Sequence, residues 1–275
     1  MRLPEERVLP EGFVPEPLPE TPVEPKDAAT VVLLREGPSG LEVFLQRRVK
    51  AMAFAGGMTV FPGGGVDERD ADASVAWAGP GPQWWAERFG CSPALARALV
   101  CAAVRETFEE SGVLLAGPDE QRVVADTRPY AEARTALVSR ELSLARFLEE
   151  NSLVLRADLL RPWANWVTPE EEPRRYDTRF FLAAMPDGQR ADGVTSEAVE
   201  AYWATPQRAL QDWAEGKCQL LPPTHVTLTE VAGHDSLASA LRAERELVKI
   251  LPKMIKQDGR WRIVLPGEPG YQEER

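Results

Sequence analysis

Residues 105–113 read RETFEESGV, and this stretch constrains the fold of the 275-residue chain more than any other. Glu106, Glu109 and Glu110 are spaced i, i+3 and i+4, so on a helix all three carboxylates project from one face. Like charges at this spacing repel each other, by roughly a few tenths of a kcal/mol per pair on an exposed helix. Oxygen ligands gathered on one face suit a hard cation such as Mg²⁺. The stretch therefore predicts a helix that holds metal on one side.

The helix that carries these glutamates is predicted to begin at Ser92 or Pro93 and to end at Gly112. Serine is favoured at the N-cap and proline at the first helical position, while glycine is a common C-terminal signal. The residues that fall opposite the glutamates, at about 100° per residue, are apolar: Val100, Cys101, Val104 and Phe108. One face is therefore expected to pack on the core and the other to line a cleft.

Composition narrows the classes of function. The net charge of −11 argues against nonspecific binding of nucleic acid or membranes. It leaves room for an anionic substrate, because a divalent cation can bridge carboxylates to phosphates. No apolar run approaches the roughly 20 residues of a membrane span, and the first residues form no apolar signal segment. We expect a cytoplasmic protein that binds neither nucleic acid nor membranes.

The cysteines and histidines offer little chemistry. The three cysteines are an odd number without metal-ligand spacing, so we expect them to be small buried apolar residues in a reducing compartment. The two histidines, His225 and His234, give little support to a histidine zinc site or a Ser-His-Asp triad.

The remaining chain alternates predicted strands and helices. Residues 1–28 hold seven prolines and are predicted to form an extended arm. Two strands joined by the turn EGPSG are predicted to form a hairpin, at residues 30–35 and 41–47. Further strands are expected at 58–61, 163–167, 179–185 and about 260–267. Helices are expected within 119–150, from about Pro206, and at 236–256, whereas residues 70–93 are expected to be irregular. The alternation predicts an α/β sandwich with a mixed sheet.

The glycine-rich turn FPGGGVD at residues 61–67, an acidic loop and RETFEESGV together resemble the Nudix box, the signature of the Nudix hydrolases. The residues that match the helical half of the box are Arg105, Glu106, Glu109, Glu110, Gly112 and Val113. Thr107 stands where a bulky aliphatic residue is usual. In the loop half Gly64 matches, and the acidic position falls on Asp70. Thirty-four residues separate Asp70 from Arg105, where the family pattern has seven, so an insertion splits the box.

The split box is similar to the branch of the family that contains the mammalian peroxisomal coenzyme A diphosphatase. The stretches LRPWANWVTP, RRYDTRFFLA and LLPPT also resemble that branch. The chain ends in QEER rather than a peroxisomal signal such as SKL, and it lacks a clear copy of the longer coenzyme A signature.

The resemblance implies a Nudix-type α/β/α sandwich with a mixed sheet and helical insertions. The Nudix domain would span residues 29–230, with insertions at about 71–91 and 119–150. Residues 231–275 would add a C-terminal helix and a short strand packed on that domain. The insertions would shape the substrate pocket or a homodimer interface, and the sequence leaves both open.

The implied reaction is hydrolysis of the diphosphate bond in a nucleoside diphosphate linked to another moiety. Coenzyme A or an acyl-coenzyme A is the leading substrate, and ADP-ribose, NADH or a dinucleoside polyphosphate are the alternatives. A non-catalytic nucleotide sensor of the same fold is an alternative from another class. Such sensors typically lose box glutamates, whereas this chain keeps all three.

The resemblance also implies roles for individual residues. Glu106, Glu109 and Glu110 would bind Mg²⁺ or Mn²⁺, with the Gly64 carbonyl as a further ligand beside a turn made by Gly63 and Gly65. Arg105 would orient a glutamate through a charge-assisted hydrogen bond.

Other site residues are less well defined by the sequence. A later loop is expected to supply a further base or ligand. Glu197 and Glu200 are the candidates, with Glu170, Glu171 and Glu172 as competitors. Arg47, Arg48 and Lys50 are candidates for contacts with substrate phosphates, although a basic strand end is more often only solvated. Trp163 and Trp166 are expected to pack in the core rather than to stack on an adenine.

Overall fold

The structure is a computed structural model that describes residues 21–51 and 55–271. The strands of its main sheet are β1 (Lys26–Gly37), β2 (Gly40–Arg48), β3 (Thr59–Val60), β4 (Gly63–Gly65), β8 (Leu160–Val167), β9 (Tyr176–Ala184), β10 (Ala198–Ala204) and β11 (Lys249–Ile250). The strands outside it are β5 (Trp77–Ala78), β6 (Ala116–Gly117), β7 (Val154–Arg156), β12 (Lys253–Gln257) and β13 (Arg260–Val264).

The α-helices are α1 (Pro82–Phe89), α2 (Pro93–Ser111), α3 (Ala131–Val138), α4 (Leu144–Glu150), α5 (Pro206–Ala214), α6 (Pro222–Val231) and α7 (Leu237–Leu241). The part of the chain that the structure describes also contains three short 3₁₀ helices: η1 (Glu68–Ala71), η2 (Arg128–Tyr130) and η3 (Ala157–Leu159).

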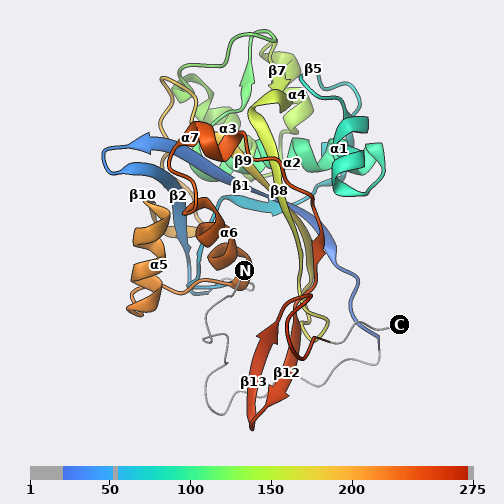
Figure 1. Ribbon diagram of the computed structural model, residues 1–275. Helices are drawn as coiled ribbons and strands as arrows, with labels where there is room; N and C mark the ends of the chain where they lie inside the picture. Colours follow the sequence, from blue (N-terminus) through green and yellow to red (C-terminus); the bar gives the residue numbers. More distant parts are fainter. Residues whose placement is uncertain (1–20, 52–54, 272–275) are drawn as a thin grey trace.

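Within the described residues the main sheet has eight strands, some parallel and some antiparallel. Its path runs β10-β2-β1-β9-β8-β11, with β3 paired to β2 and β4 paired to β1. The pairs β1–β9 and β8–β11 are parallel, and the remaining pairs are antiparallel. Helices α1 to α4 lie on one side of the sheet, and α5 and α6 lie on the other (Figure 1). The predicted α/β sandwich with a mixed sheet is therefore confirmed.

The central strand β1 connects two apolar cores. Its side chains alternate, so Val31 and Leu33 join the core under α1, α2 and α4. Val32 and Leu34 join the core under α5, α6 and α7. Because both faces are covered, the strand is a nearly continuous apolar run, TVVLL, rather than an alternating one.

Several predicted elements are confirmed. The hairpin at residues 30–47 forms as β1 and β2, with Leu34 opposite Val43 and Gly37 opposite Gly40. The long helix runs from Pro93 to Ser111, and the last strand is β13. Helices occur within 119–150, although only from Arg128 onwards.

The predicted helix at residues 236–256 is wrong, because only Leu237–Leu241 is helical. Residues Lys249 and Ile250 instead pair with β8, and Pro252 lies between β11 and β12. A strand position beside β8 overrides the local helical pattern, and Pro252 cannot continue a helix because it lacks an amide hydrogen.

The prediction that residues 70–93 are irregular is also wrong in part. Helix α1 forms there with Pro82 at its first turn, and it ends at Gly90, which has φ 61°. Strand β10 forms in a region where the sequence predicts only a helix, from Pro206 onwards. It forms at the sheet edge because β2 offers it a pairing partner.

At the N-terminus, the first 20 residues of the predicted arm lie outside the described residues, and Lys26 already belongs to β1. None of the helices in the described part of the chain is long and apolar enough to span a membrane. The division at residues 28 and 230 stays a prediction.

Candidate active site

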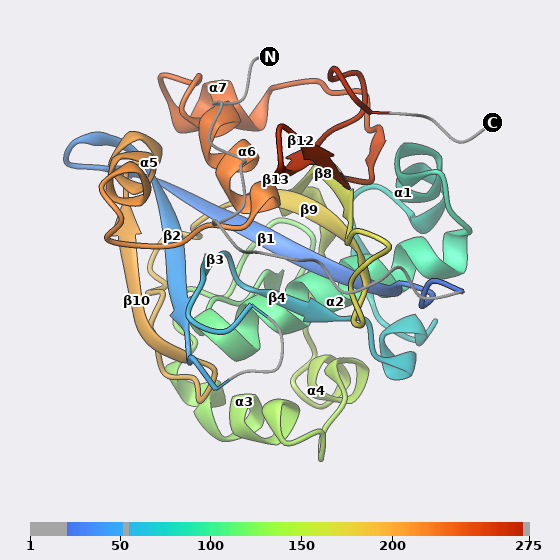
Figure 2. The ribbon, with the colours of Figure 1, turned by 90° about the horizontal axis from the view of Figure 1, so that it is seen from below.

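Helix α2 brings the three glutamates to the centre of the molecule. Ser92 caps its start by accepting a hydrogen bond from the Leu95 amide at 3.2 Å, as the sequence predicted. The helix ends at Gly112, whose φ of 72° lies in the left-handed region that favours glycine. Seen from below, strand β4 lies beside α2 (Figure 2). The glycine-rich turn and the glutamate helix are thus brought together.

The glycines of β4 permit this close approach. A Cβ atom added to Gly64 would lie 2.6 Å from the carboxyl carbon of Glu106. The amide of Gly63 donates a hydrogen bond of 2.9 Å to Oε2 of Glu110. Any side chain at position 64 would occupy the space that the Glu106 carboxylate now fills.

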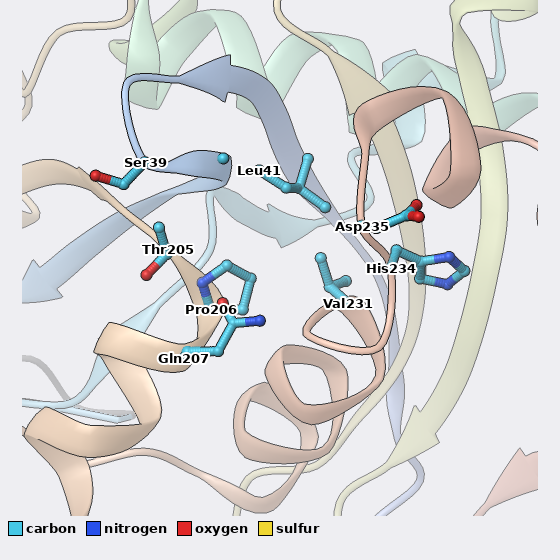
Figure 3. Close-up of a pocket in the computed structure, with 9 residues that line it drawn as sticks. Ser39, Leu41, Thr205, Pro206, Gln207, Val231, His234 and Asp235 are labelled. Atoms are coloured by element: carbon cyan, nitrogen blue, oxygen red, sulfur yellow. The ribbon is translucent and has the colours of Figure 1, made fainter.

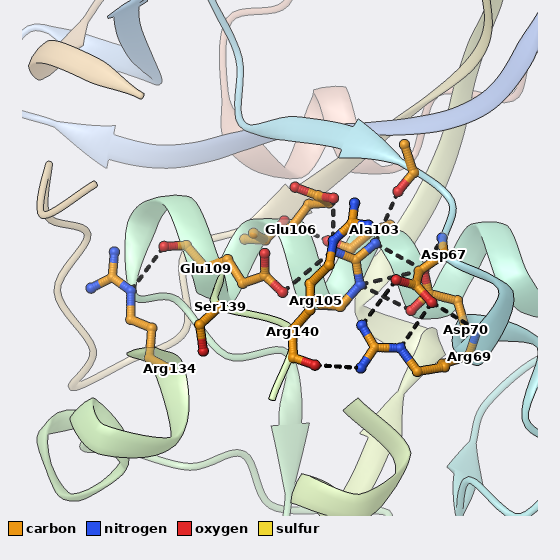
Figure 4. A network of polar contacts seen from close by, with 12 residues as sticks. Asp67, Arg69, Asp70, Ala103, Arg105, Glu106, Glu109, Arg134, Ser139 and Arg140 are labelled. Atoms are coloured by element: carbon orange, nitrogen blue, oxygen red, sulfur yellow. Dashed lines mark hydrogen bonds and ion pairs between the residues drawn. The ribbon is translucent and has the colours of Figure 1, made fainter. Parts of the chain in front are cut away.

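Arg105 lies at the centre of the charged network (Figure 4). Its Nε and Nη2 donate to the two carboxylate oxygens of Asp70 at 3.0 and 2.8 Å. Its Nη1 donates to Glu106 at 2.7 Å and to Glu109 at 3.3 Å, and its Nη2 also donates to the Gly65 carbonyl at 2.9 Å. The hydrogen bond to a glutamate that was expected of Arg105 is therefore present.

Asp70 acts in this network as the partner of Arg105. It is 3% exposed, and it also accepts a hydrogen bond from the Asp67 amide at 2.8 Å. Asp67 in turn caps η1 in a reciprocal capping box with Asp70. A residue at the start of the insertion is thereby tied to the helix that follows the insertion.

All three glutamates have raised pKa values. Burial, reinforced by the charge of Glu109, raises the pKa of Glu106 to about 7, although Arg105 opposes the shift. Burial also raises the pKa of Glu109 and raises that of Glu110 well above its usual value. Buried carboxylates with raised pKa values are stabilised as anions by an added cation.

The residues at this site fit a divalent cation by their chemistry. Carboxylate and carbonyl oxygens are the ligands that Mg²⁺ and Mn²⁺ prefer, and the backbone of Gly64 lies against Glu106. Within the described residues, no three His, Cys, Asp or Glu side chains converge as a metal site in their present orientations. Two of the glutamates accept hydrogen bonds from Arg105, and the third accepts one from the Gly63 amide.

Among the candidates for a further ligand, Glu197 lies beside the site. It forms an ion pair of 2.8 Å with Arg48, and its charge raises the pKa of Glu110 while Arg48 lowers it. Glu200 forms an ion pair of 2.9 Å with Arg47, and both side chains are about half exposed. The competitors, Glu170 to Glu172, lie in the connection between β8 and β9.

The candidate phosphate-binding residues differ in their surroundings. Arg47 and Arg48 end strand β2, and each is paired with a glutamate of the segment that carries β10. Lys50 is exposed and lies beside Gly57. Whether any of them binds phosphate stays a prediction.

The structure also adds residues that the sequence analysis missed. Gln46, which is 2% exposed, donates from Nε2 to the Glu110 carbonyl at 3.1 Å. Arg134 donates to the Glu109 carbonyl at 3.0 Å and pairs with Asp192. The D-x-x-D spacing of Asp67 and Asp70 is a capping signal that the sequence contained. Nothing local marks Gln46 or Arg134.

The prediction that Trp163 and Trp166 pack in the core is confirmed, whereas of the three cysteines only Cys101 is buried and Cys91 and Cys218 are partly exposed. Trp163 and Trp166 are each 2% exposed and lie in the core under α5 to α7. Burial raises the pKa of the Cys101 thiol to about 12, and it also raises the pKa values of Cys91 and Cys218. These thiols are poor nucleophiles near neutral pH.

A separate hollow of about 360 Å³ lies between the β1–β2 turn and the helical layer of α5 to α7 (Figure 3). The residues that line it are Ser39, Gly40, Leu41, Thr205, Pro206, Gln207, Val231, His234 and Asp235. Leu41 is near the start of β2 and Arg48 is at its end, so the hollow and the glutamates lie near opposite ends of one strand.

Comparison with known proteins defines the class. The sequence model described as the NUDT19 Nudix domain matches residues 93–231, which are about half of the chain. The chain therefore belongs to the Nudix hydrolase family. Within that family, the match is to the NUDT19 type of domain, in agreement with the resemblance inferred from the split box.

Relatives agree with this placement. The chain is 28% identical over 251 residues to putative nudix hydrolase 7 of Caenorhabditis elegans, a match covering 90% of this chain and 75% of that protein. It is 27% identical over 277 residues to the acyl-coenzyme A diphosphatase NUDT19 of Homo sapiens, covering 86% and 73%. The crystal structure of a NUDIX hydrolase from Alicyclobacillus acidocaldarius matches with a TM-score of 0.66 at 27% identity, covering 81% of this chain and 98% of that one.

Proposed function

We propose that this Nudix hydrolase cleaves the diphosphate bond of coenzyme A or an acyl-coenzyme A in a reaction that depends on Mg²⁺ or Mn²⁺. The observation that carries the proposal is the arrangement of Glu106, Glu109 and Glu110 on one face of α2, with Glu110 buried, Glu106 against Gly64 and raised carboxylate pKa values. The substrate class is supported by the relatives named acyl-coenzyme A diphosphatase and by the NUDT19 type of domain.

In this reaction a water oxygen forms a bond to one phosphorus, and the P–O bond to the bridging oxygen breaks. With coenzyme A the two products are an adenosine bisphosphate and a phosphopantetheine. The bound cation would supply charge neutralisation of the diphosphate and a lower pKa for the attacking water. Glu106, Glu109, Glu110 and the Gly64 carbonyl are the groups that would hold it.

The protein groups have separate tasks. Arg105 holds Glu106 and Glu109 in place through charge-assisted hydrogen bonds, and Asp70 fixes Arg105. Glu197 is our candidate for the further base or ligand, because it pairs with Arg48 at the end of β2, the strand whose Gln46 contacts Glu110. Arg48 is paired with Glu197 and would neutralise part of its charge when the site is empty of substrate.

The test is a turnover screen with Mg²⁺ and Mn²⁺ across coenzyme A, an acyl-coenzyme A, ADP-ribose, NADH and a dinucleoside polyphosphate. Mass spectrometry identifies the products, and reaction in ¹⁸O-labelled water shows which phosphorus is attacked. We expect the highest kcat/KM for coenzyme A or its acyl derivative. Faster cleavage of ADP-ribose or NADH would replace the substrate assignment, and binding without turnover would favour a sensor.

The homodimer and the cytoplasmic location stay predictions. Sedimentation velocity of the purified chain measures the first, and fractionation of the source cells measures the second.

A further inference from the structure

At the C-terminal end of α2, the helix that carries the glutamates contacts the insertion at residues 119–150. A helix leaves its last four carbonyls without partners inside the helix. Here each of the four is satisfied, and each by a different part of the chain. The Phe108 carbonyl accepts from the Gly112 amide at 2.9 Å, and the Ser111 carbonyl accepts from the Asp192 amide at 2.8 Å.

The two middle carbonyls belong to the glutamates themselves. The Glu109 carbonyl accepts from Nε of Arg134 on α3 at 3.0 Å, and the Glu110 carbonyl accepts from Gln46 on β2 at 3.1 Å. The positions of the two glutamate backbones are thereby set by hydrogen bonds from outside the helix.

The charges at the end of α2 favour the contact with Arg134. The last helical residues, FEES at 108–111, contain two acids and no cation. Acids at a helix C-terminus are opposed by the helix dipole, and a cation there is favoured. Arg134, whose side chain is 12% exposed, supplies that cation from the insertion.

The same guanidinium also holds the loop that leads to Glu197. Nη1 of Arg134 donates to both carboxylate oxygens of Asp192 at 2.9 Å. Gly112 leaves room for this pair, because an added Cβ would lie 2.9 Å from both Arg134 Nη1 and Asp192 Oδ2. In Figure 4, Arg134 lies at the opposite end of the polar network from Arg69 and Asp70.

We propose that Arg134 is a positioning residue that fixes the last turn of α2 and the loop before Glu197 in the geometry that catalysis requires. This inference rests on the proposed function and assigns a task to the insertion at residues 119–150. The planar guanidinium serves two acceptors in different directions, which a lysine ammonium cannot match in geometry.

The experiment compares Arg134→Met, Arg134→Lys and Asp192→Asn with the wild type, using whichever diphosphate the wild type turns over. Small displacements of catalytic groups reduce rates strongly, so we expect Arg134→Met to lower kcat about 10- to 100-fold with KM within about threefold. Arg134→Lys should recover part of the loss, and Asp192→Asn should lose about fivefold because the Glu109 contact remains. The matched control is Arg146→Met on α4, an exposed pair with Glu150, which should keep the wild-type kcat.

Hydrogen exchange provides a readout that does not depend on activity. In Arg134→Met the amides of Gly112 and Asp192 should exchange about tenfold faster, while that of Leu95 at the start of α2 should not change. If Arg134→Met does not fold, the kcat and exchange rates of Arg134→Lys and Asp192→Asn test the inference. Wild-type kcat in the folded variants, or unchanged exchange at both amides, overturns the inference. If the wild type shows no turnover, the proposed function is overturned instead. Hydrogen exchange then still tests whether Arg134 fixes the end of α2 and the loop before Glu197.

Discussion

The two helical layers of this protein pack on the same sheet, yet they bury different things. The layer of α1 to α4 encloses Arg105, Asp70 and Glu110, all at most 9% exposed. The layer of α5 to α7 buries an apolar core around Trp163 and Trp166 and leaves a hollow of about 360 Å³. Charge is concentrated on one side and open volume on the other.

This difference indicates that buried carboxylates, rather than the hollow, mark the candidate active site. Burying carboxylates is costly, so a fold keeps them only where their charge is matched or used. The hollow holds no comparable group of buried carboxylates, and His234 in its lining forms a hydrogen bond of 3.0 Å with Ser239 through Nδ1. We therefore propose that the reaction takes place at the charged layer, and we assign no chemistry to the hollow.

The largest effect is expected for Glu110→Gln, which tests whether the charged layer carries the reaction. Because a box carboxylate is removed, we expect kcat to fall by about 10²- to 10⁴-fold at saturating Mg²⁺. Thermal unfolding should show an unchanged or higher midpoint, since a neutral amide costs less to bury than a carboxylate. Near wild-type turnover in the folded variant would remove Glu110 from the site.

A pair of glycine variants sharpens the comparison at atomic scale. In Gly64→Ala the new methyl group displaces the Glu106 carboxylate, and we expect kcat to fall about 10- to 100-fold. The carboxylate is the end of a flexible side chain, so stability should change by less than about 1 kcal/mol. Gly65→Ala is the control, because an added Cβ there meets none of the described atoms within 4 Å. Equal losses in the two variants would contradict the role of close packing at Gly64.

The charged layer should also respond differently to the loss of an ion pair. Asp70→Ala leaves Arg105 buried with fewer partners, and we expect the free energy of unfolding to fall by about 3 kcal/mol. Glu150→Ala breaks the exposed pair with Arg146 and should cost about 0.5 kcal/mol. Urea titrations of both variants measure the difference, and similar values would mean that the Asp70 pair is no more than a surface contact.

The smallest effect is expected at the hollow. Ser39→Ala and Gln207→Ala change its lining, and we expect kcat and KM to stay within about twofold of the wild type because neither residue lies at the charged layer. A tenfold change in either constant, measured on the same substrate, would show that the hollow takes part in the reaction.

Much of the fold could be predicted where the signals are local. The caps at Ser92 and Gly112, the hairpin of β1 and β2, and the shared face of the glutamates all depend on neighbouring residues. The helix expected at residues 236–256 fails because Lys249 and Ile250 pair with β8, about 84 residues earlier in the chain. A local pattern cannot report that pairing.

The features of the site also divide into those set by neighbouring residues and those set by tertiary packing. The sequence alone determined the spacing of the glutamates, the glycine turn and the split of the Nudix box, because these depend on backbone geometry over a few residues. Only the tertiary structure decided that Asp70 meets Arg105, that Glu197 pairs with Arg48, and that Arg134 reaches the end of α2. These contacts join residues that are 25 to 149 positions apart. Such pairs meet only after the helices have packed on the sheet, and that packing depends on the whole core rather than on any one segment.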